Sequence, residues 1–157
     1  GISTTQPLTD LALNNKGIAL ISGHKGTLFR SEDGGATWRK IATNAGSLRL
    51  LSVAINDDGI ALYSGEKGLL SHSSDSGKTW KKATFPSTSF IDALAIGKRV
   101  CLGNPGAKGF YIRSVDGCKT WTLHPVVGAT LIRSLSINKS DKAIYAAVEG
   151  IFTSEWE

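Results

Sequence analysis

One octapeptide occurs three times in this sequence of 157 residues, and it constrains the fold more than any other feature. The copies start at Ser31, Ser73 and Ser114 and follow the template Ser-x-Asp-x-Gly-x-Thr-Trp, except that Cys118 replaces the glycine of the third copy. Asp and Ser side chains in a turn accept hydrogen bonds from nearby backbone N–H groups, and glycine tolerates a positive φ. The template therefore predicts a tight turn between two strands, with its tryptophan packed beneath the turn. We assign this structural role to Ser31, Asp33, Gly35, Thr37, Trp38, Ser73, Asp75, Gly77, Thr79, Trp80, Ser114, Asp116, Thr120 and Trp121.

The octapeptides mark a longer repeat. A partial fourth copy at Ser154 gives spacings of 42, 41 and 40 residues between the four serines. Before each copy, apolar residues alternate with small or polar ones at a period of two, which indicates strands. Each repeat supplies four antiparallel strands in about 40 residues, the length of a propeller blade. The expected repeats span residues 8–43, 50–85, 91–126 and 132–157.

The octapeptide resembles the Asp-box, or bacterial neuraminidase repeat, of sialidases, sortilin-type receptors and photosystem II assembly factor-like proteins. This resemblance implies an all-β fold, a single β-propeller domain of four-stranded antiparallel blades with Asp-box turns. The sequence predicts four repeats with the last blade incomplete, either as a small ring or as part of a larger propeller. Association of two such chains through the unpaired edges of the terminal blades, giving a homo-oligomer, is a third way to satisfy those edges.

A binding face is expected where the turn between the second and third strands meets the link to the next blade. A lysine recurs in three of these turns, and the links add basic and aromatic residues. Basic groups beside exposed aromatic rings suit an anionic sugar or an acidic protein surface. The candidate ligand-binding residues of this loop face are His24, Lys25, Arg49, Glu66, Lys67, Phe85, Phe90, Lys108, His124 and Arg133.

The preferred functional interpretation is a non-catalytic recognition module that binds a glycan or a protein partner through the loop face. The alternative is a protein scaffold of the photosystem II assembly type, and a third hypothesis is a fragment of a sialidase-like glycoside hydrolase. The net charge of +5 allows an acidic partner, but the absence of long Lys/Arg runs argues against nucleic acid. No apolar stretch of a membrane-spanning length occurs.

Residues suited to catalysis are sparse. The three histidines, His24, His72 and His124, occupy non-equivalent positions without metal-ligand spacing. A glycosidase needs two carboxylates facing one sugar cleft, whereas most acids here stand alone in an octapeptide or in a turn between first and second strands. We therefore expect no enzyme activity, no metal and no cofactor.

The two cysteines, Cys101 and Cys118, belong to one repeat and are 17 residues apart. Cys101 opens a second strand and Cys118 follows the third strand, so an antiparallel arrangement could bring them together. A disulfide would imply an oxidising compartment, and with it an extracellular or periplasmic location. Two unpaired, buried thiols are the alternative.

Overall fold

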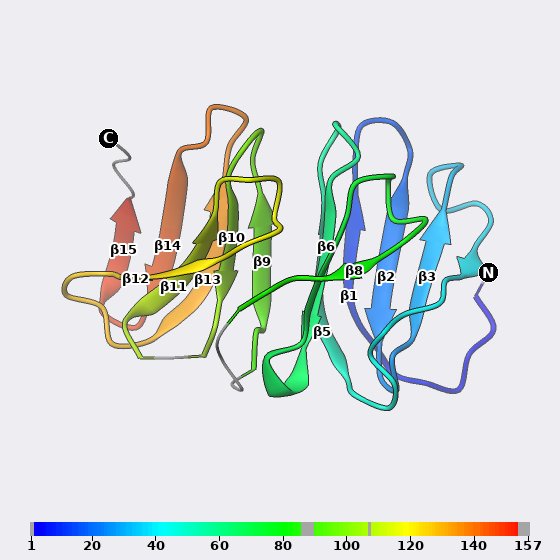
Figure 1. The fold of residues 1–157 in the computed structure, drawn as a ribbon, viewed down its shortest axis with the longest axis horizontal. Helices are drawn as coiled ribbons and strands as arrows, with labels where there is room; N and C mark the ends of the chain where they lie inside the picture. Colours follow the sequence, from blue (N-terminus) through cyan, green and yellow to red (C-terminus); the bar gives the residue numbers. More distant parts are fainter. Residues whose placement is uncertain (1, 86–89, 107, 154–157) are drawn as a thin grey trace.

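The computed structural model describes residues 2–85, 90–106 and 108–153, and strands make up nearly all of its regular structure (Figure 1). The strands form four antiparallel sheets in chain order, which we number blades 1 to 4. Within the described residues, the first three sheets have four strands and the last has three. The expected all-β propeller architecture is confirmed. The partial octapeptide copy at Ser154 lies outside the described residues.

Each blade runs outward from its first strand to its last, with neighbouring strands paired in sequence order. Blade 1 contains β1 (Leu8–Leu13), β2 (Ala19–Gly23), β3 (Leu28–Ser31) and β4 (Arg39–Lys40). Blade 2 contains β5 (Leu50–Ile55), β6 (Ala61–Gly65), β7 (Leu70–Ser73) and β8 (Lys81–Lys82), with the short 3₁₀ turn η1 (Glu66–Gly68) between β6 and β7. Blade 3 contains β9 (Ala93–Ile96), β10 (Cys101–Asn104), β11 (Phe110–Ser114) and β12 (Thr122–Pro125). Blade 4 contains β13 (Ile132–Ile137), β14 (Ala143–Ala147) and β15 (Gly150–Thr153).

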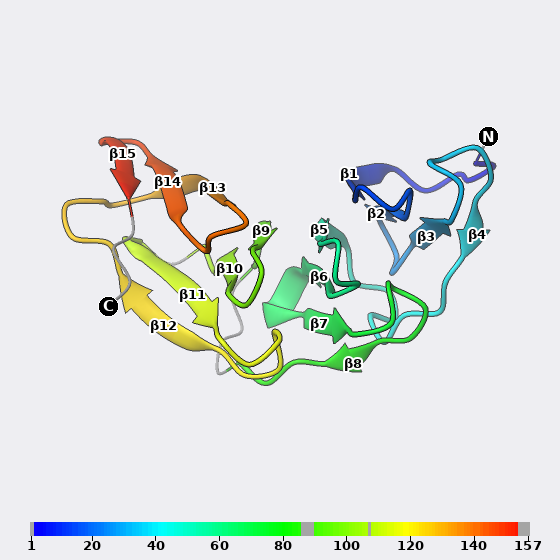
Figure 2. The ribbon, with the colours of Figure 1, turned by 90° about the horizontal axis from the view of Figure 1, so that it is seen from above.

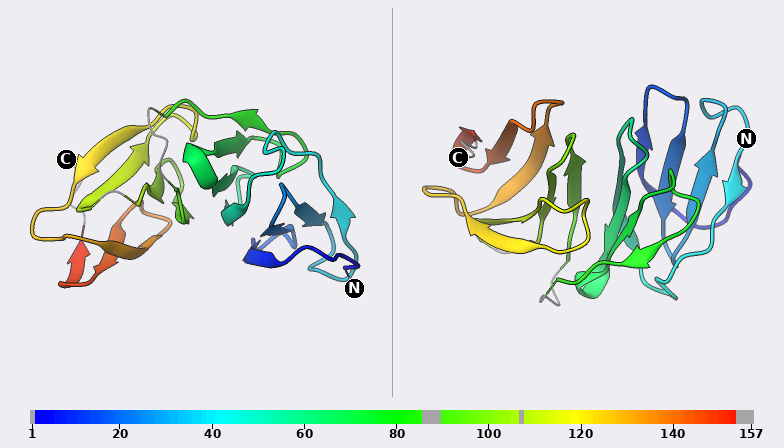
Figure 3. Two further views of the ribbon diagram at one scale, coloured as in Figure 1. Left: turned by 90° about the horizontal axis from the view of Figure 1, so that it is seen from below. Right: turned by 45° about the horizontal axis from the view of Figure 1, so that its top comes forward.

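The blades are arranged as an open arc. Figure 2 shows the first strands β1, β5, β9 and β13 on its concave side and the outer strands β4, β8 and β12 on its convex side. Consecutive first strands lie side by side, from β1 to β5, β5 to β9 and β9 to β13. Blades 1 and 4 stand at opposite ends of the arc in both views of Figure 3. Of the two arrangements that the sequence left open, the described residues thus form a part of a ring and not a closed ring of four blades.

The arc has two chemically different ends. The turns between the first and second strands lie beside the Asp boxes, as the bond from the Gly34 N–H to the Gly17 carbonyl shows (2.9 Å), and we call this the box end. The turns between the second and third strands lie beside the links between blades, as the bond from the Gly26 N–H to the Leu48 carbonyl shows (2.7 Å). We call this the link end, which is the lower end in Figure 1.

Hydrophobic side chains are buried mainly between consecutive blades. One cluster joins Leu20 and Leu28 of blade 1 to Val53 and Tyr63 of blade 2, and equivalent clusters join blade 2 to blade 3 and blade 3 to blade 4. The middle strands β2 and β6 are therefore buried along nearly their whole length, while the two-residue outer strands β4 and β8 are exposed. No helix among the described residues is long and apolar enough to cross a membrane.

Candidate functional site

The first Asp box is closed by its serine and its aspartate. Ser31 Oγ donates to Asp33 Oδ1 at 2.7 Å and accepts from the Gly35 N–H at 2.9 Å. Asp33 also accepts from the backbone N–H of Thr37 at 2.8 Å and from its hydroxyl at 2.5 Å. The same serine–aspartate and aspartate–threonine bonds recur in the other two boxes, in Ser73, Asp75 and Thr79 and in Ser114, Asp116 and Thr120.

Each box tryptophan donates a hydrogen bond to the turn above it. The bonds from indole Nε1 to a backbone carbonyl are Trp38 to Gly35 (2.8 Å), Trp80 to Gly77 (3.1 Å) and Trp121 to Cys118 (3.1 Å). Trp121 is buried, with 5% of its surface exposed, whereas Trp38 and Trp80 are half-buried. Trp80 also packs on Tyr63, with ring centroids 4.6 Å apart. The indole rings of Trp80 and Trp121 thus join their turns to the hydrophobic layers between blades.

The turn hydrogen bonds hold the box aspartates ionised. Bonds from the Thr37 hydroxyl and N–H lower the pKa of Asp33 to about 2. Burial acts to raise the pKa of Asp75, but bonds from Thr79 and Ser73 outweigh it and lower the value to about 2. The pKa of Asp116 is lowered further by the same kind of bonds, against the opposing effect of burial. Carboxylates with such low pKa values are poor general acids near neutral pH, so the geometry fits a structural role.

Each box contains two consecutive residues in the left-handed conformation, where the template predicts one. The pairs, with their φ angles, are Gly34 (69°) and Gly35 (96°), Ser76 (61°) and Gly77 (78°), and Gly117 (76°) and Cys118 (65°). The second and third boxes thus each carry one residue with a Cβ at a costly backbone position. The left-handed conformation of Ser76 could not be predicted from the sequence, because serine is compatible with many turn conformations.

Cys101 and Cys118 are joined by a disulfide, with their Cα atoms 5.7 Å apart. Cys101 is paired with Ser114 across β10 and β11, and Cys118 follows in the turn that leaves β11. Both residues are buried in the hydrophobic cluster between blades 2 and 3. The bond therefore connects a central strand to an Asp-box turn inside one blade.

The three predicted lysines of the loop face lie at the link end. Lys25, Lys67 and Lys108 are exposed and belong to equivalent turns of blades 1, 2 and 3. Lys25 and Lys67 adopt positive φ angles of 52° and 55°. Both lysines thus have a left-handed backbone in their turns, and both residues are exposed.

The remaining loop-face candidates do not form one exposed cluster. Arg49 pairs with Glu66, which accepts from its Nε at 2.6 Å and from its backbone N–H at 2.9 Å. Phe85 packs against the cluster between blades 2 and 3, so it is not the exposed ring that the sequence predicts. His124 lies in the outer strand β12 and stacks on Tyr111, with ring centroids 5.2 Å apart. The other candidates lie near the same end, half-buried at His24 and exposed at Phe90 and Arg133.

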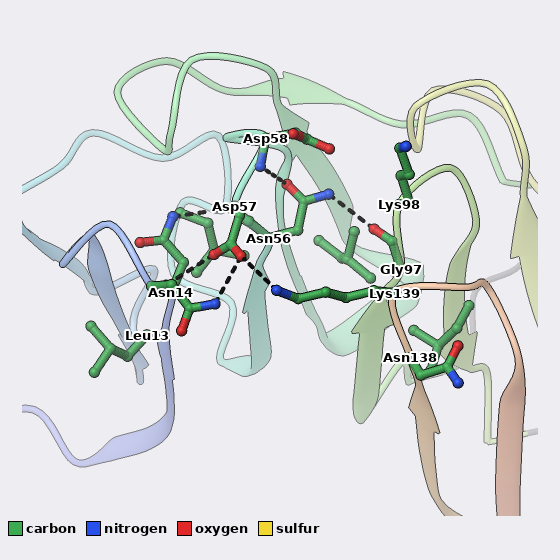
Figure 4. Close-up of a pocket in the computed structure, with 13 residues that line it drawn as sticks. Leu13, Asn14, Asn56, Asp57, Asp58, Gly97, Lys98, Asn138 and Lys139 are labelled. Carbon is green, nitrogen blue, oxygen red and sulfur yellow. Dashed lines mark hydrogen bonds and ion pairs between the residues drawn. The ribbon is translucent and has the colours of Figure 1, made fainter.

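A pocket of about 530 Å³ opens on the concave side at the box end (Figure 4). All four blades contribute to it where their first strands end. Its apolar part consists of four equivalent side chains, Leu13, Ile55, Ile96 and Ile137. Its polar part comes from the turns that follow these strands. This size lies within the range of ligand-binding pockets in proteins.

Asparagines of the pocket connect neighbouring blades. Asn14 Nδ2 donates to the Asn56 carbonyl and Asn56 Nδ2 donates to the Gly97 carbonyl, both at 3.0 Å. The Oδ1 atoms of Asn14 and Asn56 accept backbone N–H groups of their own turns. Asn138 occupies the same position in blade 4. Asparagine recurring at the end of a first strand was a signal in the sequence, but the loop-face prediction did not use it.

Charged groups of both signs line the rim of the pocket. Lys139 of blade 4 reaches Asp57 of blade 2 at 3.4 Å, and Asn15 donates to the same carboxylate from its backbone and its side chain (Figure 4). The bonds from Asn15, together with Lys139, lower the pKa of Asp57. Within the described part of the chain, the Lys98 ammonium and the Asp58 carboxylate make no hydrogen bond or ion pair. Both exposed groups are available to a ligand.

Metal binding finds no support in this geometry. Across residues 2–85, 90–106 and 108–153, no three His, Cys, Asp or Glu side chains are grouped so that they could hold a metal ion. The pocket offers amide, carboxylate and ammonium groups around an apolar floor. Such a surface can hydrogen-bond a ligand and cover part of its apolar surface.

Residues 1–157 match the family model described as photosynthesis system II assembly factor YCF48. The chain belongs to the YCF48 family of photosystem II assembly factors. No protein of curated function matches the sequence.

Three solved structures illustrate the likeness in fold. YCF48 bound to a D1 peptide is 16% identical, with a TM-score of 0.70 over 99% of this chain and 52% of that one. The computationally designed Ika4 protein is 14% identical, with a TM-score of 0.75 over 99% of this chain and 94% of that one. The GH74 xyloglucanase of Xanthomonas campestris is 19% identical, with a TM-score of 0.66 over 88% of this chain and 25% of that enzyme.

These comparisons favour the assembly-factor alternative over the recognition module preferred from the sequence. The YCF48 chain spans about twice the length covered here, because this chain matches 52% of it. Likeness to a xyloglucanase at 19% identity establishes the shared fold alone. A glycan ligand and a secreted location remain predictions from the sequence.

Proposed function

We propose that this chain is a non-catalytic, protein-binding part of a photosystem II assembly factor and that it binds a polypeptide segment of its client. The observation that carries the proposal is the YCF48 family match over all 157 residues. The likeness in fold to a YCF48 bound to a D1 peptide supports a peptide as the class of ligand. The box aspartates, whose pKa values are held well below the usual range by the hydrogen bonds of their turns, contribute no group suited to acid catalysis at neutral pH.

The pocket at the box end is the proposed peptide site. A polypeptide backbone presents alternating N–H and C=O groups, and the rim offers the Asp58 carboxylate as an acceptor and the Lys98 ammonium as a donor. The apolar floor at Ile55 and Ile96 would cover a hydrophobic side chain of the same segment. An acidic residue of the peptide would pair with Lys98.

The link end is the competing location, because Lys25, Lys67 and Lys108 are exposed there and carry the same charge. Its binding would rest mainly on exposed charges, which salt screens over about 8–10 Å. Two of its other candidates, Arg49 and Glu66, already neutralise each other. The concave pocket therefore fits an extended ligand better.

Fluorescence anisotropy with a labelled D1 peptide tests both the function and the site. Lys98→Gln and Asp58→Asn should each weaken binding about tenfold, since a hydrogen bond to a charged group is worth about 1.5–3 kcal/mol. The matched control replaces Lys25, Lys67 and Lys108 by Gln together and should leave the affinity unchanged. A scrambled peptide of the same composition controls for attraction by charge alone.

The outcomes separate the function from its location. Weakening by the link-end variant alone would move the site to that end and leave the proposed function standing. Failure of the wild-type chain to prefer the D1 peptide over its scrambled form would refute peptide binding by this chain.

A disulfide is stable in oxidising compartments, which supports the proposal of an extracellular or periplasmic location.

A further inference from the structure

Blades 1 and 2 present the same set of positions to the blade that follows them, at the box end of the arc. The residue that precedes the box serine is paired with a residue of the outer strand. These pairs are Arg30 with Arg39 in blade 1 and His72 with Lys81 in blade 2. Directly paired residues project to the same face of a sheet. The junction between blades 1 and 2 and the junction between blades 2 and 3 are therefore equivalent positions of one repeat.

In the junction between blades 1 and 2, a carboxylate of the chain itself holds the cations together. Glu32, the second residue of the first box, contacts Arg30 and accepts from Arg39 Nη2 at 2.7 Å. The hydrogen bond and the charge of Arg30, together with the charges of Arg39 and Lys78, lower the pKa of Glu32. The Glu32 side chain is 50% exposed, so it closes this junction on its solvent side.

The junction between blades 2 and 3 has cations at the equivalent positions but lacks this carboxylate. Ser74 occupies the position of Glu32 in the second box, and Lys119 of the third box occupies the position of Lys78. Lys81 and Lys119 are both exposed, and neither forms an ion pair within the described residues. The group that joins the cations of the first junction is therefore missing from the second.

His72 adds a hydrogen-bond donor to these two lysines. Its Nδ1 is buried without a hydrogen-bond partner, and no residue in the described part of the chain bonds to its Nε2. A buried N–H without an acceptor is rarer in proteins than a buried acceptor without a donor, so we place the proton of the neutral ring on Nε2. Burial and the charges of Lys119 and Lys81 lower the pKa of His72, against the opposing charge of Asp116. Both ammonium groups thus lie close enough to act on the ring.

The third box supplies one carboxylate to this junction, but it does not take the place of Glu32. Asp116 accepts the Thr120 hydroxyl at 2.6 Å, and Asp75 accepts the Thr79 hydroxyl at 2.6 Å in the same way. Each aspartate belongs to the turn of its own box. The first junction contains Glu32 in addition to Asp75, whereas the second contains Asp116 alone among the described carboxylates that act on its histidine.

Backbone contacts fix the two sides of the second junction. The Thr84 N–H, in the link after β8, donates to the Lys119 carbonyl at 3.3 Å, and Thr84 forms a parallel bridge with Thr120. Lys81 is held by its pairing with His72 across β7 and β8. The fold thus keeps the backbone of both lysines in place beside the ring, and side-chain rotation alone brings their ammonium groups to an anion.

We propose that His72, Lys81 and Lys119 form a carboxylate site that binds a Glu or Asp side chain of a protein partner. The Nε2–H and the two ammonium groups can all donate to one carboxylate, and hydrogen bonds assisted by charge are stronger than neutral ones. The fold already accepts a glutamate side chain at the equivalent position of the first junction. A partner surface can reach the site, because the outer strand β8 is exposed on the convex side of the arc (Figure 2). The carboxylate site lies outside the concave pocket and does not depend on what that pocket binds.

NMR of the histidine ring signals of the 157-residue chain tests the site, with N-acetyl-glutamate amide as the probe. The His72 signals should shift saturably as the probe is added, while those of His24 and His124 should not. N-acetyl-glutamine amide is the matched neutral probe and should cause no shift. Lys81→Gln/Lys119→Gln should raise the half-saturating concentration roughly threefold to tenfold. Lys25→Gln/Lys67→Gln removes the same charge at the link end and should leave that concentration unchanged.

Ser74→Glu supplies the missing carboxylate from the chain itself. It should raise the pKa of His72 by roughly one pH unit, because an opposite charge favours the protonated ring. It should also abolish the response to the probe, since the site is then filled. Ser74→Gln is the matched neutral variant and should do neither.

Each contrary result has a definite meaning. No saturable shift of His72, equal shifts with the two probes, or unchanged affinity in Lys81→Gln/Lys119→Gln would overturn the proposal, as would full binding of the probe to Ser74→Glu. Acetate distinguishes a partner side chain from a free small carboxylate, because it carries the same group without the rest of an amino acid. Saturation by acetate at a lower concentration than by the capped glutamate would overturn the assignment to a protein partner.

Discussion

Arg30 of blade 1 donates a hydrogen bond from its Nε to the backbone carbonyl of Ser76, 46 residues later, in the second Asp box. The distance is 2.5 Å, and the side chain of Arg30 is only 1% exposed. Its guanidinium also contacts Glu32, which Arg39 pairs with from the solvent side at 2.7 Å. A buried cation is thus placed between two blades, where it satisfies a carbonyl in the left-handed turn of the next repeat.

Arg30→Ala should lower the free energy of unfolding by about 2–4 kcal/mol, because it leaves a cavity and removes the donor to the Ser76 carbonyl. Urea unfolding followed by tryptophan fluorescence measures the change. Arg39→Ala is the control and should change stability by no more than about 0.5 kcal/mol, since its ion pair with Glu32 is exposed. Equal effects of the two substitutions would show that the contact with Ser76 contributes nothing.

The box aspartates predict a loss of stability in acid. The pKa of Asp75 is about 2 in the folded chain, against about 3.9 for an unfolded aspartate, and Asp33 and Asp116 are also lowered. A depressed folded pKa contributes stability that is complete above the unfolded value and is lost as the pH falls through the folded value. Melting temperatures followed by circular dichroism should therefore fall between about pH 4 and about pH 2.

Asp75→Asn tests whether the box is responsible for this acid dependence. It should cost about 1–3 kcal/mol at pH 7, because an amide cannot accept all the bonds from Ser73 and Thr79. The difference from the wild type should shrink as the pH falls toward 2. Asp58→Asn is the control, since its carboxylate makes no hydrogen bond within the described residues. A constant difference at every pH would contradict the proposed role of the ionised Asp75.

The three box tryptophans should differ in their effect on stability. Trp121→Ala should cost about 3–5 kcal/mol, because Trp121 is buried in the cluster between blades 2 and 3. Trp80→Ala should follow closely, since Trp80 packs on Tyr63. Trp38→Ala should cost least, because Trp38 belongs to blade 1 and no preceding blade packs on it in the described chain. Chemical unfolding of the three variants gives the order, and a largest loss at Trp38 would contradict the interpretation.

The sequence predicts the blades because their signals are local. Box turns such as Ser73 to Trp80 carry their own hydrogen-bond partners, and the alternation in 11–14 and its equivalents fixes which side chains face a neighbouring blade. The role of Arg30 could not be predicted, because its contact with Ser76 depends on how two blades pack. The pocket was missed for the same reason, although its asparagines recur in the sequence.

The loop-face residues show what residue type alone leaves undetermined. The sequence places Arg49, Phe85 and His124 near one end, and it cannot tell that Arg49 pairs with Glu66 or that Phe85 packs inward. Charge and aromatic character indicate that a side chain could bind a ligand, but neighbouring side chains decide whether it is free to do so. The exposed lysines of this end stay candidates for the same reason, since Lys25 and Lys67 form no ion pair within the described residues.

The disulfide between Cys101 and Cys118 should contribute measurably to the stability of the chain. Closing a loop of 17 residues stabilises by about 3 kcal/mol on the chain-entropy estimate, so the Cys101→Ala/Cys118→Ala variant should lose about that much relative to the oxidised wild type. Intact mass after alkylation, with and without reduction, verifies the bond. Two alkylated thiols in protein folded without reductant would contradict the disulfide.

A second pair of variants isolates the strain at Cys118, whose φ is 65°. Cys101→Ala/Cys118→Gly should be more stable than Cys101→Ala/Cys118→Ala by about 1 kcal/mol, because only the alanine places a Cβ in a left-handed backbone. Gly77 is the equivalent residue of the second box. Gly77→Ala should destabilise the chain, since its new Cβ would lie 2.9 Å from a Leu20 methyl group. Equal stability of the two cysteine-free variants would show that the third box has relaxed its turn around the missing glycine, and that the disulfide compensates for no backbone strain.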